Sequence, residues 1–180
     1  EESDTFAPVA KTAQKRAVWL GINLITALLA SAVISMFEAT ISKVVYLAAV
    51  MPIVASMGGI AGSQTLTLVI RSIALGHLSG SNWVYLLSRE AGVAAINGLL
   101  WAVLVGALTT FWFNDFILGS ILGAALIVNL LVAAVVGALL PIGLEKVGID
   151  PALAGSVILT TVTDVIGFIA FLGLATICYL

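Results

Sequence analysis

The stretch LTTVTDVIGF, residues 159–168, holds a single acid, Asp164, roughly halfway along an otherwise uncharged run over residues 151–180. At a helical rise of ~1.5 Å per residue, the segment from Asp150 to Asp164 covers about 20 Å, which puts Asp164 near the midplane of a hydrocarbon core ~30 Å thick. An ionisable side chain at that depth is costly, and it is tolerated mainly where it faces a bundle interior, a partner or water. The stretch therefore predicts a membrane helix that carries a cation site in a transmembrane pathway.

The composition extends this prediction to the whole chain. Of its 180 residues, 62% are hydrophobic and 9% are charged, whereas soluble proteins have ~45–50% and about 25%. Five apolar runs each exceed the ~18–20 residues that a membrane helix needs, and none alternates as outer-membrane β-strands do. The expected fold is an all-α integral membrane protein with five transmembrane helices per chain, at residues 17–37, 44–75, 83–113, 116–144 and 151–178.

The beginning of the chain is expected to lie outside the membrane. Residues 1–16 read as a polar cytoplasmic lead-in to a membrane domain over residues 17–180. The apolar run that follows is long enough to span and lacks the cleavage pattern of a signal peptide. Because the chain does not start with Met, a fragment of a longer protein with a soluble domain upstream is one interpretation.

The basic residues indicate how the chain is oriented in the membrane. Lys43 alone falls in the loops of one side, and the other six fall on the opposite side: Lys11, Lys15, Arg16, Arg71, Arg89 and Lys146. Lys and Arg are enriched in cytoplasmic loops. We therefore expect a multi-pass protein of the cell (inner or plasma) membrane with a cytoplasmic N-terminus and an external C-terminus.

Several function classes lack the residues that they require. A net charge of −2 without a basic stripe does not fit nucleic-acid binding. A single cysteine, Cys178, excludes an intrachain disulfide and a thiolate metal cage. An intramembrane enzyme needs a nucleophile with a base, or two acids, but this chain has one histidine, His77, which is expected in a loop, and one acid inside the spans. No catalytic residue is therefore expected.

The second span contains an unusual polar and small-residue segment, MPIVASMGGIAGSQT at residues 51–65. Pro52 frees a backbone carbonyl one turn earlier, and such carbonyls are tolerated at membrane depth only against protein or a water-filled cavity. One interpretation is a surface along an ion path, with the candidate residues Gly58, Gly59, Ala61, Gly62, Gln64 and Thr65. The other is close helix packing, because Gly58 and Gly62 are four residues apart and match a small-residue contact motif. The two can coexist on opposite faces of the helix.

The fifth span carries a polar stripe, because Ser156, Thr160 and Asp164 follow each other at helical spacing. Thr161 and Gly167 lie three residues to either side of the acid. A threonine in a membrane helix often bonds its own backbone, and Asp164 itself could bond a Ser, Thr or Asn of a neighbouring helix. Interhelical hydrogen bonds are also expected for three asparagines inside the other spans, Asn23, Asn97 and Asn129.

Charge balance suggests two copies of the chain. One carboxylate does not neutralise a divalent ion, whereas two related by a two-fold axis do, which predicts a homodimer with Asp164 near its symmetry mate. Oxygen-only surroundings suit hard ions such as Mg²⁺, Mn²⁺ or Ca²⁺. Because Mg²⁺ dehydrates reluctantly, the ion is expected to pass largely hydrated and to contact the protein through its waters.

These residues resemble the membrane domain of the MgtE family of magnesium channels, over nearly the whole chain from Trp19 onward. The matching parts are Met51-Pro52, Gly58-Gly59-Ile60-Ala61-Gly62-Ser63-Gln64, Val69-Ile70-Arg71, Ala74-Leu75-Gly76, Arg89-Glu90, Asp150-Pro151-Ala152-Leu153, Thr160-Thr161 and Asp164. The resemblance implies a homodimeric channel whose pore is lined by the second and fifth spans, with Asp164 as its main ion-site residue. It also implies cytosolic regulatory domains that close the pore when Mg²⁺ is plentiful, and these are expected to be missing from this chain.

One position departs from the family pattern Gly-Gly-Asn-Ala-Gly, because Ile60 stands where the family has Asn. The selectivity among divalent cations is therefore open. The nearest alternative function is a proton- or sodium-coupled divalent cation transporter, in which Asp164 would bind the coupling ion. A non-conducting scaffold subunit is a further alternative, but it does not explain the polar stripe.

Overall fold

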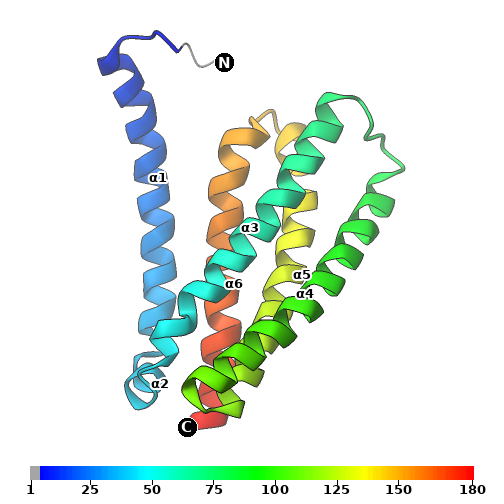
Figure 1. Cartoon of the computed structure of the whole chain (residues 1–180). Helices are drawn as coiled ribbons and strands as arrows, with labels where there is room; N and C mark the ends of the chain where they lie inside the picture. The colour runs from blue at the N-terminus through cyan, green and yellow to red at the C-terminus, as the bar shows by residue number, and fades with distance from the viewer. Residues whose placement is uncertain (1–4) are drawn as a thin grey trace.

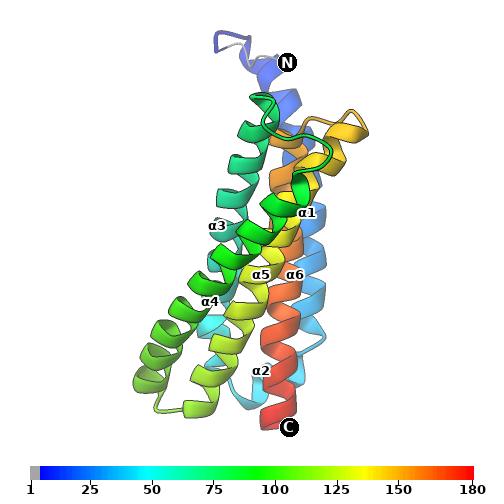
Figure 2. The same cartoon turned by 90° about the vertical axis from the view of Figure 1, so that its right-hand side faces the viewer.

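The computed structural model describes residues 5–180, and over this range the chain is helical without any strand. Its elements are α1 (Val9–Ser35), α2 (Glu38–Lys43), α3 (Leu47–Ala74), α4 (Trp83–Phe113), α5 (Phe116–Lys146) and α6 (Pro151–Tyr179). Within the described residues, all but the short α2 are long and apolar enough to cross a membrane, five in total. The predicted all-α membrane fold is confirmed. Figures 1 and 2 show the long helices side by side, each running opposite to the one before it.

The ends of the helices differ from the expected ranges at several places. α1 begins at Val9, so part of the expected polar lead-in is already helical. The expected loop between the first two spans forms α2, whose first residue is Glu38 and whose last is Lys43, a charge order that complements the helix dipole. α5 continues to Lys146, two residues beyond its expected end.

The sharp connections between helices are explained by their capping residues. Asn114 ends α4 with a positive φ of 53°, a conformation that asparagine tolerates better than most residues. Asp115 then caps α5, accepting hydrogen bonds from the backbone N–H groups of Ile117 at 3.0 Å and Leu118 at 3.2 Å. At the start of α6, Asp150 accepts from Ala152 at 3.0 Å, and Pro151 occupies the first turn, where no N–H is needed.

α5 lies at the centre of the bundle and packs against α3, α4 and α6. Glycines on α5 let these neighbours approach closely, as expected where lipid removes the hydrophobic drive for helix association. A Cβ added at Gly137 would lie 2.9 Å from the Gly62 carbonyl of α3, and one at Gly123 would lie 3.1 Å from the Ala102 carbonyl of α4. The central position of α5 therefore depends on backbone-to-backbone contact.

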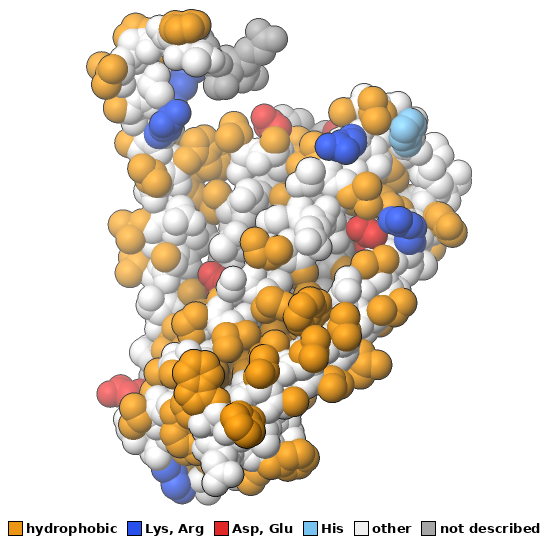
Figure 3. All heavy atoms as spheres, viewed as in Figure 1, with side chains coloured by type: hydrophobic (Ala, Val, Ile, Leu, Met, Phe, Trp, Pro, Cys, Tyr) orange, Lys and Arg blue, Asp and Glu red, His pale blue; other side chains and the backbone are white. Residues whose placement is uncertain are grey.

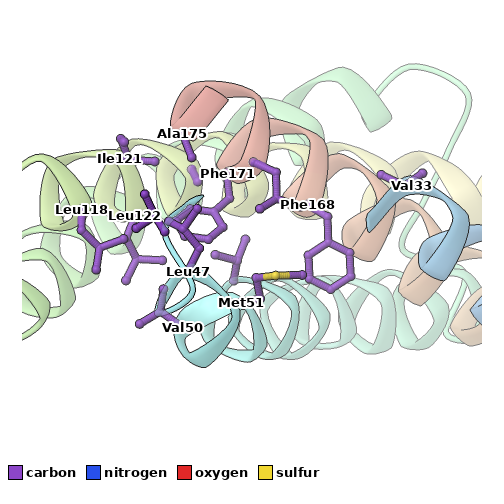
Figure 4. Close-up of a cluster of buried hydrophobic side chains, with 14 of the residues drawn as sticks. Val33, Leu47, Val50, Met51, Leu118, Ile121, Leu122, Phe168, Phe171 and Ala175 are labelled. Atoms are coloured by element: carbon purple, nitrogen blue, oxygen red, sulfur yellow. The ribbon is translucent and has the colours of Figure 1, made fainter. Parts of the chain in front are cut away.

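α1 is the least integrated of the long helices. Among the other helices, α1 packs mainly against α6. Its only buried residues are Ala30 and Val33, near its C-terminal end. Figure 1 shows its N-terminal half standing apart from α6. Val33 contributes to an apolar cluster shared with α3, α5 and α6, in which Figure 4 shows Met51 beside Phe168.

Candidate functional site

Asp164 lies midway along α6 and is half-buried in the single chain. In the described part of the chain, its carboxylate has no hydrogen-bond or ion-pair partner. The expected alternative, a bond to a Ser, Thr or Asn of a neighbouring helix, is not formed there. An unpaired carboxylate at this depth needs a compensating charge, proton or water.

The polar stripe on α6 is open near Asp164. Ser156 and Thr160 are exposed in the single chain, and neither hydroxyl bonds another described residue. Thr161 behaves differently, because its hydroxyl donates to the Val157 carbonyl at 2.8 Å, as is common in membrane helices. The surface beside the acid therefore offers two free hydroxyls, one and two turns toward the N-terminal end of α6.

The residues that follow Asp164 show which side of α6 it lies on. Gly167, three residues later, is buried against Val54 of α3 and Asn129 of α5. Phe168, four residues later, is buried in the apolar cluster beside Met51 of α3 (Figure 4). Since residues three and four apart share a helix face, Asp164 lies within one turn of contacts that α6 makes with α3.

The candidate residues of α3 divide into two groups. Gly58, Gly62 and Thr65 are buried: Gly58 against Asn129, Gly62 against Leu159 of α6, and Thr65 against Gly137 of α5. A Cβ at Gly62 would lie 2.8 Å from the Leu159 side chain. The small-residue packing interpretation therefore accounts for these three positions, and for Gly167, while their part in an ion path stays a prediction.

The remaining α3 candidates keep an accessible surface. Gly59 and Ala61 are partly exposed, and a Cβ added at Gly59 would meet no atom within 4 Å. Gln64 is exposed, and Ile60, where the family has Asn, is 61% exposed. Among the candidate residues, this side of α3 and the polar stripe of α6 are the surfaces that the single chain leaves open.

Asn129 on α5 is fully buried, and its side-chain amide donates to the Val54 carbonyl of α3 at 3.0 Å. The predicted interhelical hydrogen bond is confirmed for this asparagine. No such bond is present among the described residues for Asn23, which is exposed on α1, or for Asn97, which is partly exposed on α4. A second feature of Asn129 is that its Oδ1 has no hydrogen-bond partner in the described chain.

A cluster that was not predicted from the sequence lies at the end of the bundle that carries the C-terminus. The Asp115 carboxylate accepts hydrogen bonds from the hydroxyls of Tyr46, at 2.7 Å, and Tyr179. Although desolvation opposes ionisation, these hydroxyls and the capping N–H groups together lower the pKa of Asp115, and the same carboxylate raises the pKa of Tyr46. This tyrosine–aspartate cluster (Tyr46, Asp115, Tyr179) joins three segments. The cue available in sequence was an acid in a two-residue loop.

Toward the end of the bundle that carries the N-terminus, a buried acid has a charged partner, unlike Asp164. Glu90 on α4 is 7% exposed, and Arg89 beside it donates to its carboxylate at 3.2 Å. Figure 3 shows Lys and Arg side chains both toward the end that carries the N-terminus and at the end that carries the C-terminus. No group of three His, Cys, Asp or Glu side chains gathers within the described range.

The fold and this site define a multi-pass α-helical membrane protein with an unpaired acid halfway through one span. The family model MgtE, described as a divalent cation transporter, matches residues 51–174. The chain therefore belongs to the MgtE family of divalent cation transporters.

Relatives support the same family membership. Proteins named magnesium transporter MgtE from Bacillus subtilis and Thermus thermophilus are each 33% identical to this chain, over 173 and 161 residues. These alignments cover 96% and 89% of this chain but 38% and 35% of the relatives. The chain thus spans little more than a third of the length of the curated relatives that it matches.

Proposed function

We propose that two copies of this chain form the pore of a Mg²⁺ channel, with the ion site between the two Asp164 side chains. The observation that carries the proposal is the unpaired carboxylate of Asp164 at mid-depth on α6. Family membership supports divalent cations as the transported substrate. Two carboxylates balance the charge of one divalent ion, which one carboxylate does not.

The proposed path runs along the surfaces that one chain leaves open. On α6 these are Ser156 and Thr160, whose free hydroxyls lie on the stripe that leads to Asp164. On α3 they are Gly59, Ala61 and Gln64. Hydroxyls, amide and carboxylate oxygens suit a hydrated hard cation, because they accept hydrogen bonds from its water ligands. Mn²⁺ or Ca²⁺ would be accepted by the same chemistry, with Ile60 influencing the order of preference.

Flux through purified protein in liposomes tests this proposal. We expect Asp164→Asn, which removes the charge at nearly constant shape, to reduce Mg²⁺ and Mn²⁺ influx at least roughly tenfold, since outer-shell groups alone can change metal affinity by 10–100-fold. Glu145→Gln is the matched control, because Glu145 is an exposed acid at the end of α5. Unchanged influx in Asp164→Asn, with the dimer intact, would contradict the proposal.

A coupled transporter is the second candidate, and the same unpaired carboxylate favours it, since it could carry a proton. A channel predicts currents that reverse at the Mg²⁺ equilibrium potential whatever the proton gradient. Coupling predicts that an imposed pH or Na⁺ gradient shifts this reversal potential. Voltage-clamp recording in bilayers with opposed pH and Mg²⁺ gradients separates the two mechanisms.

A further inference from the structure

Asn129 is placed where three helices meet. It lies in the middle of α5 and is fully buried, and its amide nitrogen donates to the Val54 carbonyl of α3 at 3.0 Å. Val54 lies one turn before Gly58, at the start of the segment whose open side holds Gly59 and Ala61. The hydrogen bond therefore attaches α5 to the part of α3 that precedes the proposed ion path.

Two glycines make room for this side chain. A Cβ at Gly58 of α3 would collide with the Asn129 amide nitrogen, and one at Gly167 of α6 would lie 2.7 Å from it. The amide is thus held between the backbones of α3 and α6. Because Gly167 is three residues beyond Asp164, the contact lies within one helical turn of the proposed ion site.

Simple packing does not account for an asparagine at this place. Its Oδ1 is buried without a hydrogen-bond partner in the described chain, and an unsatisfied buried acceptor destabilises a protein. Leucine has the same number of side-chain heavy atoms with the same branching, and it carries no acceptor that needs a partner. The polar group is therefore retained at a cost in stability, which points to a requirement at this position beyond filling the space.

We propose that Asn129 is a positioning residue for the ion site: by its bond to Val54 and its contact with Gly167, it sets the separation and rotation of α3 relative to α6 at the level of Asp164. Asn129 does not itself reach the ion, because it has no exposed surface. This inference rests on the proposed function. It assigns ion affinity and selectivity in part to a helix that does not line the path.

Asn129→Leu tests the inference, because it keeps the number and branching of the side-chain heavy atoms and removes the hydrogen bond. In liposomes, we expect the half-saturating Mg²⁺ concentration to rise roughly tenfold, the lower end for groups that orient metal-binding residues, and the Mg²⁺ to Mn²⁺ flux ratio to change. The amount of dimer should stay the same. Asn97→Leu is the control, since Asn97 lies on α4, away from the contact between α3 and α6.

A second variant, Asn129→Ala, removes the bond without introducing new atoms. If folded dimers of either variant keep the wild-type half-saturation and flux ratio, Asn129 is a packing residue and the inference is overturned. It is equally overturned if neither variant folds, since Asn129 would then serve folding alone. Asp164→Asn measured in parallel separates this inference from the proposed function. If Asp164→Asn keeps wild-type flux, the proposed function is refuted. If Asp164→Asn loses flux while the Asn129 variants behave like wild type, only this inference is refuted.

Discussion

At the scale of single residues, the environment of each polar group decides what it does. Asp164 and Asp115 are both acids in an apolar protein, but Asp115 accepts four hydrogen bonds while Asp164 has no partner in the described chain. A satisfied carboxylate stabilises the fold, and an unsatisfied one at membrane depth is available to a cation. The same residue type therefore has a structural role at one site and a proposed functional role at the other.

Ile60 leads to a prediction at this scale. It is 61% exposed on α3, in the segment proposed to border the ion path. We expect Ile60→Asn to shift the ratio of Mg²⁺ to Ca²⁺ flux, because an amide can hydrogen-bond the water shell of the ion and an isoleucine cannot. Liposome flux of Mg²⁺, Mn²⁺ and Ca²⁺ measures the ratios. Identical ratios in the two proteins would show that position 60 lies off the path.

Asp115 leads to a second prediction, on stability. The pKa of Asp115 in the folded protein is lowered from the ordinary 3.8. The ionised carboxylate therefore contributes its full stabilisation of the fold above pH 3.8, and this stabilisation is lost as the pH falls through the folded pKa. We expect Asp115→Asn to destabilise the protein by about 1 kcal/mol near neutral pH, which is less than the ~1.5–3 kcal/mol typical of hydrogen bonds to a charged group because this carboxylate is partly exposed. Thermal unfolding in detergent should show this difference shrinking below about pH 4. A constant difference down to about pH 2.5, well below the ordinary carboxyl pKa, would contradict it.

At the scale of helices, close backbone contact sets how the elements pack. Gly137 of α5 lies against the Gly62 carbonyl and Thr65 of α3, so an added methyl group has no space there. Gly143, on the same helix, has no atom within 4 Å of an added Cβ. We expect Gly137→Ala to destabilise the protein by about 1–3 kcal/mol and Gly143→Ala to leave it close to wild type. Melting temperatures in one detergent measure both, and equal values would refute the proposed closeness of α3 and α5.

The helices also show which features were predictable from sequence. Long apolar runs predicted five spans because burying polar groups in lipid is costly, and the place of Asp164 midway along its helix followed from its position in the uncharged run. The start of α1 at Val9 was missed, since a helix can continue into polar residues outside the membrane. The rotation of α3 was beyond prediction: whether Gly58 or Gly59 is buried depends on Asn129 and Leu159, which are distant in sequence.

At the scale of the whole molecule, one chain leaves surfaces that a second copy could cover. The polar stripe of α6 is open, and the N-terminal half of α1 stands apart from the bundle (Figure 1). The curated relatives are more than twice as long as this chain, and we propose that regulatory domains outside the aligned region close the pore. We expect this chain alone to conduct at both low and high Mg²⁺ on the cytoplasmic side. Flux that falls steeply with cytoplasmic Mg²⁺ would place a gate within the membrane domain itself.

We propose above all that a divalent cation binds between two copies of Asp164. The most direct measurement is a crystal structure of the dimer soaked with Mn²⁺, with the ion located by its anomalous scattering in the wild type and in Asp164→Asn. We expect a peak near the two-fold axis at the level of Asp164 in the wild type and its loss in the variant. A peak that persists in Asp164→Asn, or a wild-type dimer whose two Asp164 side chains lie too far apart to share one hydrated ion, would contradict it.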